Sequence, residues 1–190
     1  MVSRMAVRLD EDDPKLGEYM DIQLPSNCFR VVGPRTGYGG AMREFFAAEP
    51  DHDCYGMMGD DSVPLTPRWD QTLRDAANRV NIAYPDDMIN GETLATHCYC
   101  GGDFLRALGF WTLPDLTHLY TDTVLDYLGR LYGNLVYVPE VEIEHRHWSV
   151  GKAVHDETYV HHSAAKDAEA FGAWRSSYTF DPRLAVRLAA

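Results

Sequence analysis

Short apolar runs alternate with segments of helical periodicity along most of this chain, and this alternation constrains the fold more than any other feature. It is typical of an α/β protein in which helices pack on the faces of a sheet. We expect one domain, since 190 residues without an internal repeat or a low-complexity linker can form one sizeable core. The predicted strands are residues 5–9, 29–32, 55–58 and 93–99 and the segment that begins at Leu135.

Helical signals separate these strands. Thr66 followed by Pro67 is typical of a helix start, with threonine as the N-cap and proline at the first helical position. The apolar residues behind this start recur on one helical face, namely Trp69, Leu73, Ala76, Ala77 and Val80. Further helices are predicted over residues 41–47 and 156–174 and ahead of the stop signal at Gly133.

The charge and cysteine content disfavour several classes of function. The 17 basic and 29 acidic residues give a net charge of -12, which provides no general attraction for nucleic-acid phosphates or anionic membranes. No apolar run approaches the roughly 20 residues of a membrane span, and the N-terminus lacks the apolar core of a signal peptide. We therefore expect a soluble, cytoplasmic protein whose four cysteines are free, buried thiols rather than disulfides or a zinc site.

Two adjacent carboxylates, Asp60 and Asp61, follow the predicted strand at residues 55–58. The carboxyl ends of strands in an α/β sheet are where such folds bind ligands. Two like charges side by side repel each other unless a cation or hydrogen bonds offset the repulsion. A divalent metal that carries substrate phosphates explains the pair, because hard cations bind one or two carboxylates together with phosphate oxygens. The alternative is a solvated turn or a helix N-terminus, where acidic residues are favoured anyway.

Two histidines extend the apolar face of the last predicted strand. Beyond Pro139 the sequence alternates, and one face of the strand is formed by Val141, Ile143, His145 and His147. An imidazole that joins a carboxylate on manganese or a similar ion fits the ligand preferences of such metals. We take His145 and His147 as candidate ligands, one of which completes the site, against the alternative that both are ordinary polar groups.

Two further segments follow predicted strands. The glycine-rich loop at residues 33–40 precedes a helix, so its backbone N–H groups can approach a phosphate or a ribose; a plain turn is the alternative, because P-loop and dinucleotide patterns are absent. The acidic turn at residues 10–13 is either a solvated loop or part of the same ligand site. We expect both segments at the sheet edge that carries Asp60, Asp61 and the histidines.

Asp115 and Asp122 are the candidate bases. They flank the sequence Leu-Thr-His-Leu-Tyr-Thr ahead of a predicted helix, and either carboxylate can accept a proton if it faces a cleft. Helix capping is the alternative, and it suits Thr121-Asp122. The Gly-x-Ser-x-Gly and His-Glu-x-x-His motifs are absent from the sequence, which leaves serine-hydrolase and zinc-protease chemistry without support.

Taken in order, these segments resemble the GT-A fold of nucleotide-sugar glycosyltransferases, in particular the family-2-like enzymes of phages and actinobacteria. The resemblance spans roughly residues 3–160 and is carried by "VRLDEDDP", "VVGPRTGYGGAMREFF", "YGMMGDDSVPLTPRWD", "GFWTLPDLTHLYTDTVLDYLGRLYG" and "YVPEVEIEHRHWSVGKAVHDETY". It implies a GT-A-like, Rossmann-like mixed sheet with helices on both faces. It divides the single domain of residues 1–190 into a nucleotide and metal half (1–70), an acceptor half (71–160) and a helical tail (161–190).

The resemblance implies a nucleotide-binding part of the site. In the family, the acidic turn after an early strand contacts the nucleotide base, which implies this role for Asp10 and Asp12. The loop after the next strand lies near the ribose and the phosphates, which implies Arg35 and Gly39. Asp60 stands in the segment that matches the DxD motif, where it would face the ribose or the ion. The implied donor is a nucleoside-diphosphate sugar.

The resemblance also implies a metal site and a reaction. Asp61 would hold Mn²⁺ or Mg²⁺ with the donor diphosphate, and His145 or His147 stands where a late histidine completes the metal site in many members. Asp122 stands where the family has the base that deprotonates the acceptor, and Asp115 is the alternative base. The implied reaction moves a sugar with inversion to the hydroxyl of a glycan, a protein, a lipid or a modified nucleobase.

Several alternatives remain open in the sequence. The family fold begins with a strand and a helix that have no counterpart here, so the resemblance predicts an N-terminally shortened domain. An oligomer is compatible with this prediction. A truncated, non-catalytic relative that binds nucleotide sugars or glycans is the alternative function. Trp111 is either a stacking face for an acceptor or a core residue. The Gly-Asp-Asp of an RNA polymerase palm is a third interpretation of residues 59–61, which the acidic composition disfavours.

Overall fold

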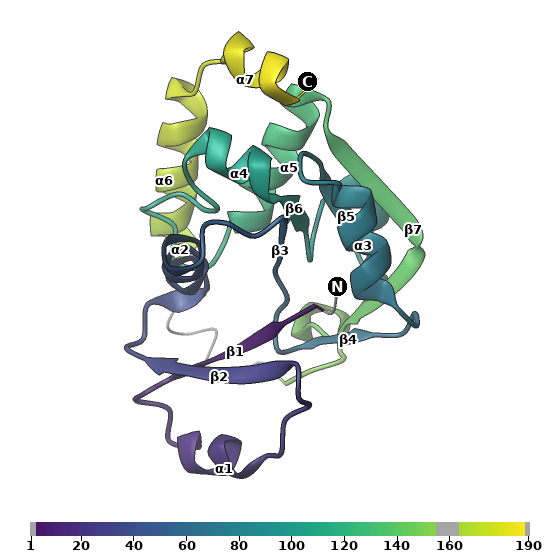
Figure 1. The fold of residues 1–190 in the computed structure, drawn as a ribbon. Helices are drawn as coiled ribbons and strands as arrows, with labels where there is room; N and C mark the ends of the chain where they lie inside the picture. The colour runs from purple at the N-terminus through teal and green to yellow at the C-terminus, as the bar shows by residue number, and fades with distance from the viewer. Residues whose placement is uncertain (1–2, 155–163, 189–190) are drawn as a thin grey trace.

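The computed structural model describes residues 3–154 and 164–188 (Figure 1). Strands and helices alternate through this part of the chain, and the predicted α/β class is confirmed. The described strands form a parallel pair, β1 with β2, and a separate five-stranded mixed sheet in the order β3-β6-β5-β7-β4. Their bounds are β1 Met5–Asp10, β2 Cys28–Gly33, β3 Cys54–Gly56, β4 Ser62–Pro64, β5 Ile82–Asp86, β6 Tyr99–Gly101 and β7 Leu135–His145.

The long strand β7 joins β4 to the rest of the five-stranded sheet. Its first half runs parallel to β5, and its last residues pair antiparallel with β4, where Ser62 lies opposite His145. In the second half Val141 and Ile143 are buried whereas Glu142 is exposed, which confirms the predicted alternation. The strand ends at His145, so His147, which is predicted on the same face, lies outside it. The end of β7 therefore lies beside the start of β4, at one end of the sheet.

Helices cover both faces of this sheet, as predicted. The helices concerned are α2 Gly37–Ala48, α3 Trp69–Ala77, α4 Gly102–Leu108 and α5 Thr121–Tyr132. On one face, Leu73 and Ala77 of α3 pack with Ala83 of β5 and with the buried side chains of β7. On the other face, the buried residues of α4 and α5 form a larger apolar cluster with Ile82 and Tyr84 of β5. Successive side chains of β5 thus enter opposite clusters.

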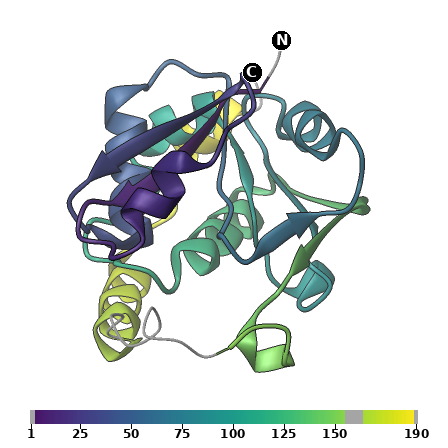
Figure 2. The ribbon, with the colours of Figure 1, turned by 90° about the horizontal axis from the view of Figure 1, so that it is seen from below.

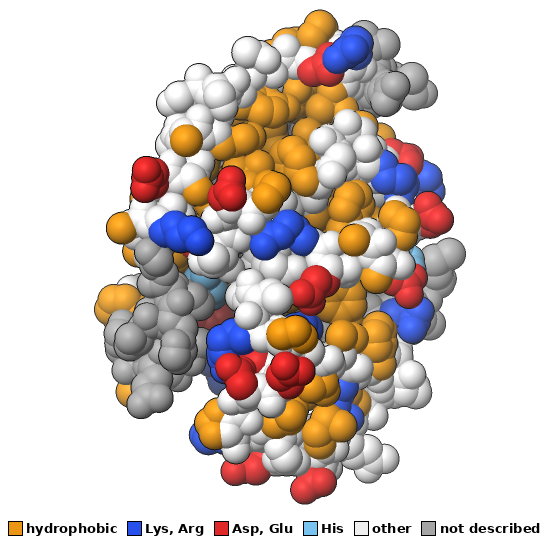
Figure 3. Space-filling model, turned by 90° about the vertical axis from the view of Figure 1, so that its left-hand side faces the viewer, with side chains coloured by type: hydrophobic (Ala, Val, Ile, Leu, Met, Phe, Trp, Pro, Cys, Tyr) orange, Lys and Arg blue, Asp and Glu red, His pale blue; other side chains and the backbone are white. Residues whose placement is uncertain are grey.

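β1, β2 and the short helix α1 (Leu16–Asp21), which the sequence analysis did not predict, form a small unit to one side of β4 and β7 (Figure 2). Within residues 3–38, all of which are described, no residue is buried. Apolar side chains lie at the surface of this unit, in the lower part of Figure 3. They are Met5, Tyr19, Met20, Ile22, Phe29 and Val32. A two-stranded sheet of this kind is marginally stable by itself.

The two sheets separate segments that we expected at one sheet edge. The acidic turn and the glycine-rich loop follow β1 and β2, whereas Asp61 and His145 belong to the five-stranded sheet. β1 pairs with β2 along its whole length, and in the described chain backbone pairing does not join this pair to the larger sheet. The expectation of a common edge is therefore wrong, and a ligand that contacts both groups must bridge two sheets.

The predicted start of α3 is also wrong. Arg68, in a left-handed conformation with a φ of 60°, is the N-cap residue, and Thr66 lies outside the helix. The Thr66 hydroxyl accepts the backbone N–H of Glu142 at 2.9 Å instead. Thr66 therefore links the connection after β4 to β7, because its side-chain oxygen binds a backbone N–H of β7 and not one of the helix.

Residues 93–99 do not form the predicted strand. A 3-10 helix, η1, occupies Gly91–Thr93, and only Tyr99 of the predicted segment belongs to β6. The backbone at His97 has a φ of 50°, which interrupts an extended conformation. The central strand of the sheet is instead β5, which has five residues and contains Pro85. Proline is rare in central strands, so the sequence does not predict this strand.

The C-terminal part of the described chain is helical. This confirms the predicted helix of residues 156–174 for residues 164–174, the part of it that the structure describes. The C-terminal part forms α6 Ala164–Ser177 and α7 Pro182–Leu188, while the predicted residues 156–163 lie outside the described chain. The four cysteines are free, as expected, but only Cys98 and Cys100 are buried, whereas Cys28 and Cys54 are partly exposed. Among the described helices, none combines the length and apolarity that a membrane crossing requires.

Candidate functional site

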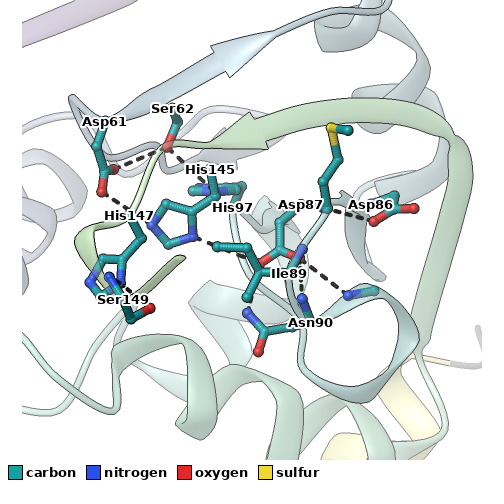
Figure 4. Close-up of polar contacts among 12 residues, drawn as sticks. Asp61, Ser62, Asp86, Asp87, Ile89, Asn90, His97, His145, His147 and Ser149 are labelled. Atoms are coloured by element: carbon teal, nitrogen blue, oxygen red, sulfur yellow. Dashed lines mark hydrogen bonds and ion pairs between the residues drawn. The ribbon is translucent and has the colours of Figure 1, made fainter. Parts of the chain in front are cut away.

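Asp61 and His145 meet where β4 pairs with β7 (Figure 4). Asp61 directly precedes β4, and His145 is the last residue of β7. The backbone N–H of Arg146 donates to the carbonyl oxygen of Asp61 at 2.8 Å, which fixes the two segments side by side. The Nε2 atom of His145 lies 3.2 Å from Oδ2 of Asp61. The structure thus brings together two residues that the sequence predicts as metal ligands.

The charges of this pair stabilise each other. The hydrogen bond from His145 lowers the pKa of Asp61. The carboxylates of Asp61 and Asp87 raise the pKa of His145 to about 9. At neutral pH, and without a bound cation, His145 is therefore an imidazolium between two carboxylates.

Asp87 is a site residue that sequence reasoning missed. It directly follows β5, its side chain is fully buried, and its Oδ2 atom lies 3.8 Å from Nδ1 of His145. Burial by itself would raise the pKa of Asp87, but the contacts with His145 and Asn90 lower it below the usual range. A signal was present in the sequence, because Asp86-Asp87 follows an apolar run in the same way as Asp60-Asp61.

His97 is a second missed residue, and a lone histidine in the sequence gave no signal for it. Its ring is buried and its centroid lies 5.0 Å from that of His145 in an edge-on arrangement. Its Nε2 atom lies 3.4 Å from the hydroxyl of Ser62. Burial, followed by the charge of His145, lowers the pKa of His97 to about 4, so this ring is neutral beside a charged one.

Left-handed backbone conformations adjoin several of these residues. Met88, which follows Asp87, has a φ of 61°, His97 has a φ of 50°, and Tyr120 near the start of α5 has a φ of 65°. Such conformations in residues other than glycine cost roughly 1–3 kcal/mol each and are frequent at functional sites. These residues lie just after β5, just before β6 and just before α5.

Asp122, the candidate base, lies in the first turn of α5. Its carboxylate accepts the N–H and the hydroxyl of Thr123 at 2.7 and 3.2 Å, and burial raises the pKa of Asp122. Burial first, and then neighbouring charges that include Asp122, Asp61 and Asp60, raise the pKa of Tyr38. The charges of the candidate base Asp122 and of the adjacent Asp60 and Asp61 therefore act on the same side chain, Tyr38 of α2.

The other candidate ligand and the other candidate base have different surroundings. His147 caps the 3-10 helix η2 (Trp148–Val150), with its Nδ1 atom 2.7 Å from the Ser149 hydroxyl, and its ring centroid lies 5.3 Å from that of His145. It therefore lies beside the Asp61–His145 pair. Asp115 is exposed in the loop ahead of α5, whereas Asp122 is partly buried.

Asp10, Asp12 and Arg35, the predicted nucleotide-binding residues, contact one another at the ends of β1 and β2. The guanidinium of Arg35 lies 3.0 Å from a carboxylate oxygen of Asp10 and 2.9 Å from one of Asp12. Arg8 lies 3.7 Å from Asp10 on the other side. The structure therefore groups these residues as an ion-pair network within the small β1–β2 unit.

Packing accounts for Gly39, the remaining predicted nucleotide-binding residue. Its N–H donates to the carbonyl oxygen of Thr117 at 2.9 Å. A Cβ atom at this position would lie only 2.6 Å from the carbonyl oxygen of Leu116. Packing also accounts for Trp111, which is buried beside Tyr55 with ring centroids 5.4 Å apart and is therefore a core residue rather than an exposed stacking face.

Asp61 and His145 suit one divalent cation in donor type and in spacing. Two ligands that bind an ion side by side at about 2.1 Å lie about 3 Å apart, close to the 3.2 Å between these two side chains. Across the described residues, three or more histidine, cysteine, aspartate or glutamate side chains do not converge as a metal site. The pair therefore fits a cation whose other ligands are water and substrate phosphates, as is usual for Mg²⁺.

No protein-family model, curated protein or solved structure matches this chain. The case for a function therefore rests on the contacts described above.

Proposed function

We propose that this chain is a metal-dependent glycosyltransferase of the GT-A type, which moves a sugar from a nucleoside-diphosphate sugar to an acceptor hydroxyl with inversion. The observation that carries the proposal is the 3.2 Å contact between Asp61 and His145. A carboxylate and an imidazole from distant parts of the sequence meet at the end of a sheet, in the chain order that the resemblance to this family implies.

Asp61 and His145 would hold the cation, Mn²⁺ or Mg²⁺, and the exposed Asp60 would face the ribose or the ion. A divalent cation at this place offsets the charge that develops on the diphosphate leaving group.

Asp122 is the proposed base. It accepts the proton of the acceptor hydroxyl while the hydroxyl oxygen forms a bond to the anomeric carbon and the bond from that carbon to the diphosphate oxygen breaks. A raised pKa, which burial gives to Asp122, makes a carboxylate a stronger base at neutral pH. Attack opposite the leaving diphosphate inverts the configuration at the anomeric carbon.

The test is calorimetric titration of UDP and of GDP into the purified protein with MnCl₂, and again with a chelator. We expect binding that requires Mn²⁺ and that weakens at least tenfold in Asp61→Asn and in His145→Ala. His147→Ala is the matched control, since this neighbouring histidine caps η2 and should retain most of the binding. Unchanged binding in Asp61→Asn and His145→Ala variants that keep the wild-type fold would refute the metal assignment.

A non-catalytic binder of nucleotide sugars is the second candidate, and the ion-pair network at Arg35 favours it. In this network Arg35 already pairs with the carboxylates of Asp10 and Asp12. A donor nucleotide would have to break these ion pairs to be oriented for transfer, whereas a sugar bound elsewhere in the site would not. Incubation with Mn²⁺ and UDP- or GDP-sugars separates the two functions. Release of free nucleoside diphosphate supports the transferase, whereas a raised melting temperature without release supports the binder.

A further inference from the structure

The buried carboxylate of Asp87 is held by several hydrogen bonds of the loop that follows β5. One oxygen accepts the backbone N–H groups of Ile89, Asn90 and Gly91 at 3.0, 2.6 and 3.2 Å. The other oxygen, Oδ2, accepts the side-chain amide of Asn90 at 2.7 Å. A carboxylate with this many donors is fixed in position, and Figure 4 shows it on the side of the His145 ring away from Asp61.

His145 is tied to Asp87 through its backbone and its ring. Its backbone N–H donates to the carbonyl oxygen of Asp87 at 3.3 Å. Its Nδ1 atom is buried, lacks a hydrogen-bond partner among the described residues, and lies 3.8 Å from Oδ2 of Asp87. Nε2, the other ring nitrogen, faces Asp61. The two ring nitrogens therefore face two different carboxylates, one fixed and buried and one partly exposed.

We propose that Asp87 is a positioning residue that keeps a proton on Nδ1 of His145 and thereby presents the lone pair of Nε2, together with Asp61, to a divalent cation. The inference rests on the proposed function, because it deepens the same metal site. Histidines that bind metals usually direct their other ring N–H to a carboxylate or a carbonyl, which fixes the tautomer and the orientation of the ring. A buried carboxylate is suited to this task when its own donors fix its position, as those of Asp87 do.

Loop capping is the competing explanation for Asp87, and two substitutions separate it from positioning. Asp87→Asn keeps an oxygen for the three backbone N–H groups but removes the charge that faces His145. Asn90→Ala removes the amide that donates to Asp87, and so loosens the loop, but leaves the carboxylate opposite His145. If Asp87 only caps the loop, Asn90→Ala should weaken metal binding as much as Asp87→Asn.

The experiment titrates MnCl₂ alone into the metal-free proteins and follows free Mn²⁺ by electron paramagnetic resonance. We expect Asp87→Asn to bind Mn²⁺ about 10- to 100-fold more weakly than the wild type, and Asn90→Ala to stay within about threefold of it. In a His145→Gln background, Asp87→Asn should produce no further loss. Circular dichroism at the same temperature checks that each variant is folded.

A spectroscopic measurement tests the orientation of the ring directly. In the zinc-loaded wild type, ¹⁵N spectra should show His145 with a proton on Nδ1 and the metal on Nε2, and in Asp87→Asn this signature should be lost or mixed. If the wild type binds Mn²⁺ and the Asp87→Asn protein binds it equally with an unchanged ¹⁵N signature, the role of Asp87 is overturned while the metal site stands. If the wild type binds no Mn²⁺, with or without nucleotide, both the metal site and this inference fail.

Discussion

The side chains of Asp61 and His145 lie 3.2 Å apart at a point where the backbone itself is paired, with Ser62 opposite His145 and the N–H of Arg146 bound to the carbonyl of Asp61. The contact is therefore built on a sheet hydrogen-bond ladder and not on two flexible loops. A site with this foundation keeps its geometry when a single side chain is replaced, which makes substitutions here informative.

The first prediction concerns the stability of the metal-free protein at alkaline pH. Asp61 and Asp87 raise the pKa of His145 from 6.5 to about 9, so this stabilisation is fully present below pH 6.5 and is lost as the pH rises through about 9. The difference corresponds to roughly 3 kcal/mol. In EDTA, the wild type should lose this much stability between pH 6.5 and 9.5, measured by urea unfolding, and His145→Gln should not. Parallel curves for the two proteins would contradict the ion pairs.

The second prediction concerns the base. Asp122→Asn should lower the turnover of a nucleotide sugar by about 10²–10⁴-fold, because an amide cannot accept the proton of the acceptor hydroxyl. Binding of UDP or GDP with Mn²⁺ should remain within a few-fold of the wild type. Asp115→Asn is the matched control, since this carboxylate is exposed in the preceding loop and should leave turnover nearly unchanged. The reverse pattern would make Asp115 the base.

The site shows which parts of such a structure a sequence can predict. The orientation of His145 can be predicted from the alternation after Pro139. Side chains alternate between the two faces of a strand, and since only one face is buried, the pattern determines the face on which His145 lies. The apolar run that ends in acids marks Asp61 as a candidate, although Asp61 lies just before the start of β4 and not at the carboxyl end of a strand as expected. Asp87 and His97 meet these residues only through the pairing of distant strands, and β5, which places Asp87, contains a proline and is too short to show periodicity.

The third prediction concerns Asp167, a fully buried carboxylate of α6 that accepts the backbone N–H groups of Thr117, His118 and Leu119 and the hydroxyl of Thr117. Burial opposes its charge, but these donors together lower the pKa of Asp167. Asp167→Asn should cost about 1–3 kcal/mol of unfolding free energy at pH 7.

The pH dependence of this effect has a definite sign. Because the folded-state pKa of Asp167 is lowered, its contribution is present above the unfolded value near 4 and is lost as the pH falls below that value. The difference between wild type and Asp167→Asn should therefore shrink in acid, as measured by denaturant titration. Glu169→Gln on the same helix is the control, since Glu169 is exposed and its replacement should change stability by less than about 0.5 kcal/mol.

The fourth prediction compares two glycines. Gly39→Ala places a Cβ atom 2.6 Å from the carbonyl oxygen of Leu116 and should destabilise the protein by roughly 1–3 kcal/mol, because backbone must move to admit it. Gly17→Ala in α1 meets no atom within 4 Å and should stabilise its helix by about 0.5–1 kcal/mol. Thermal unfolding followed by circular dichroism distinguishes them, and a neutral Gly39→Ala would mean that α2 does not lie this close to the loop.

The unit formed by β1, α1 and β2 has no buried residue in its described part, and this determines how readily it opens locally. Its amide protons are protected by one parallel pair of strands, so they exchange with solvent through local opening rather than through unfolding of the core. Asp10, Asp12 and Arg35 therefore sit on a segment that opens and closes far more often than the β4–β7 ladder. A ligand that spans both sheets would reveal itself first as a slowing of hydrogen exchange in β1 and β2.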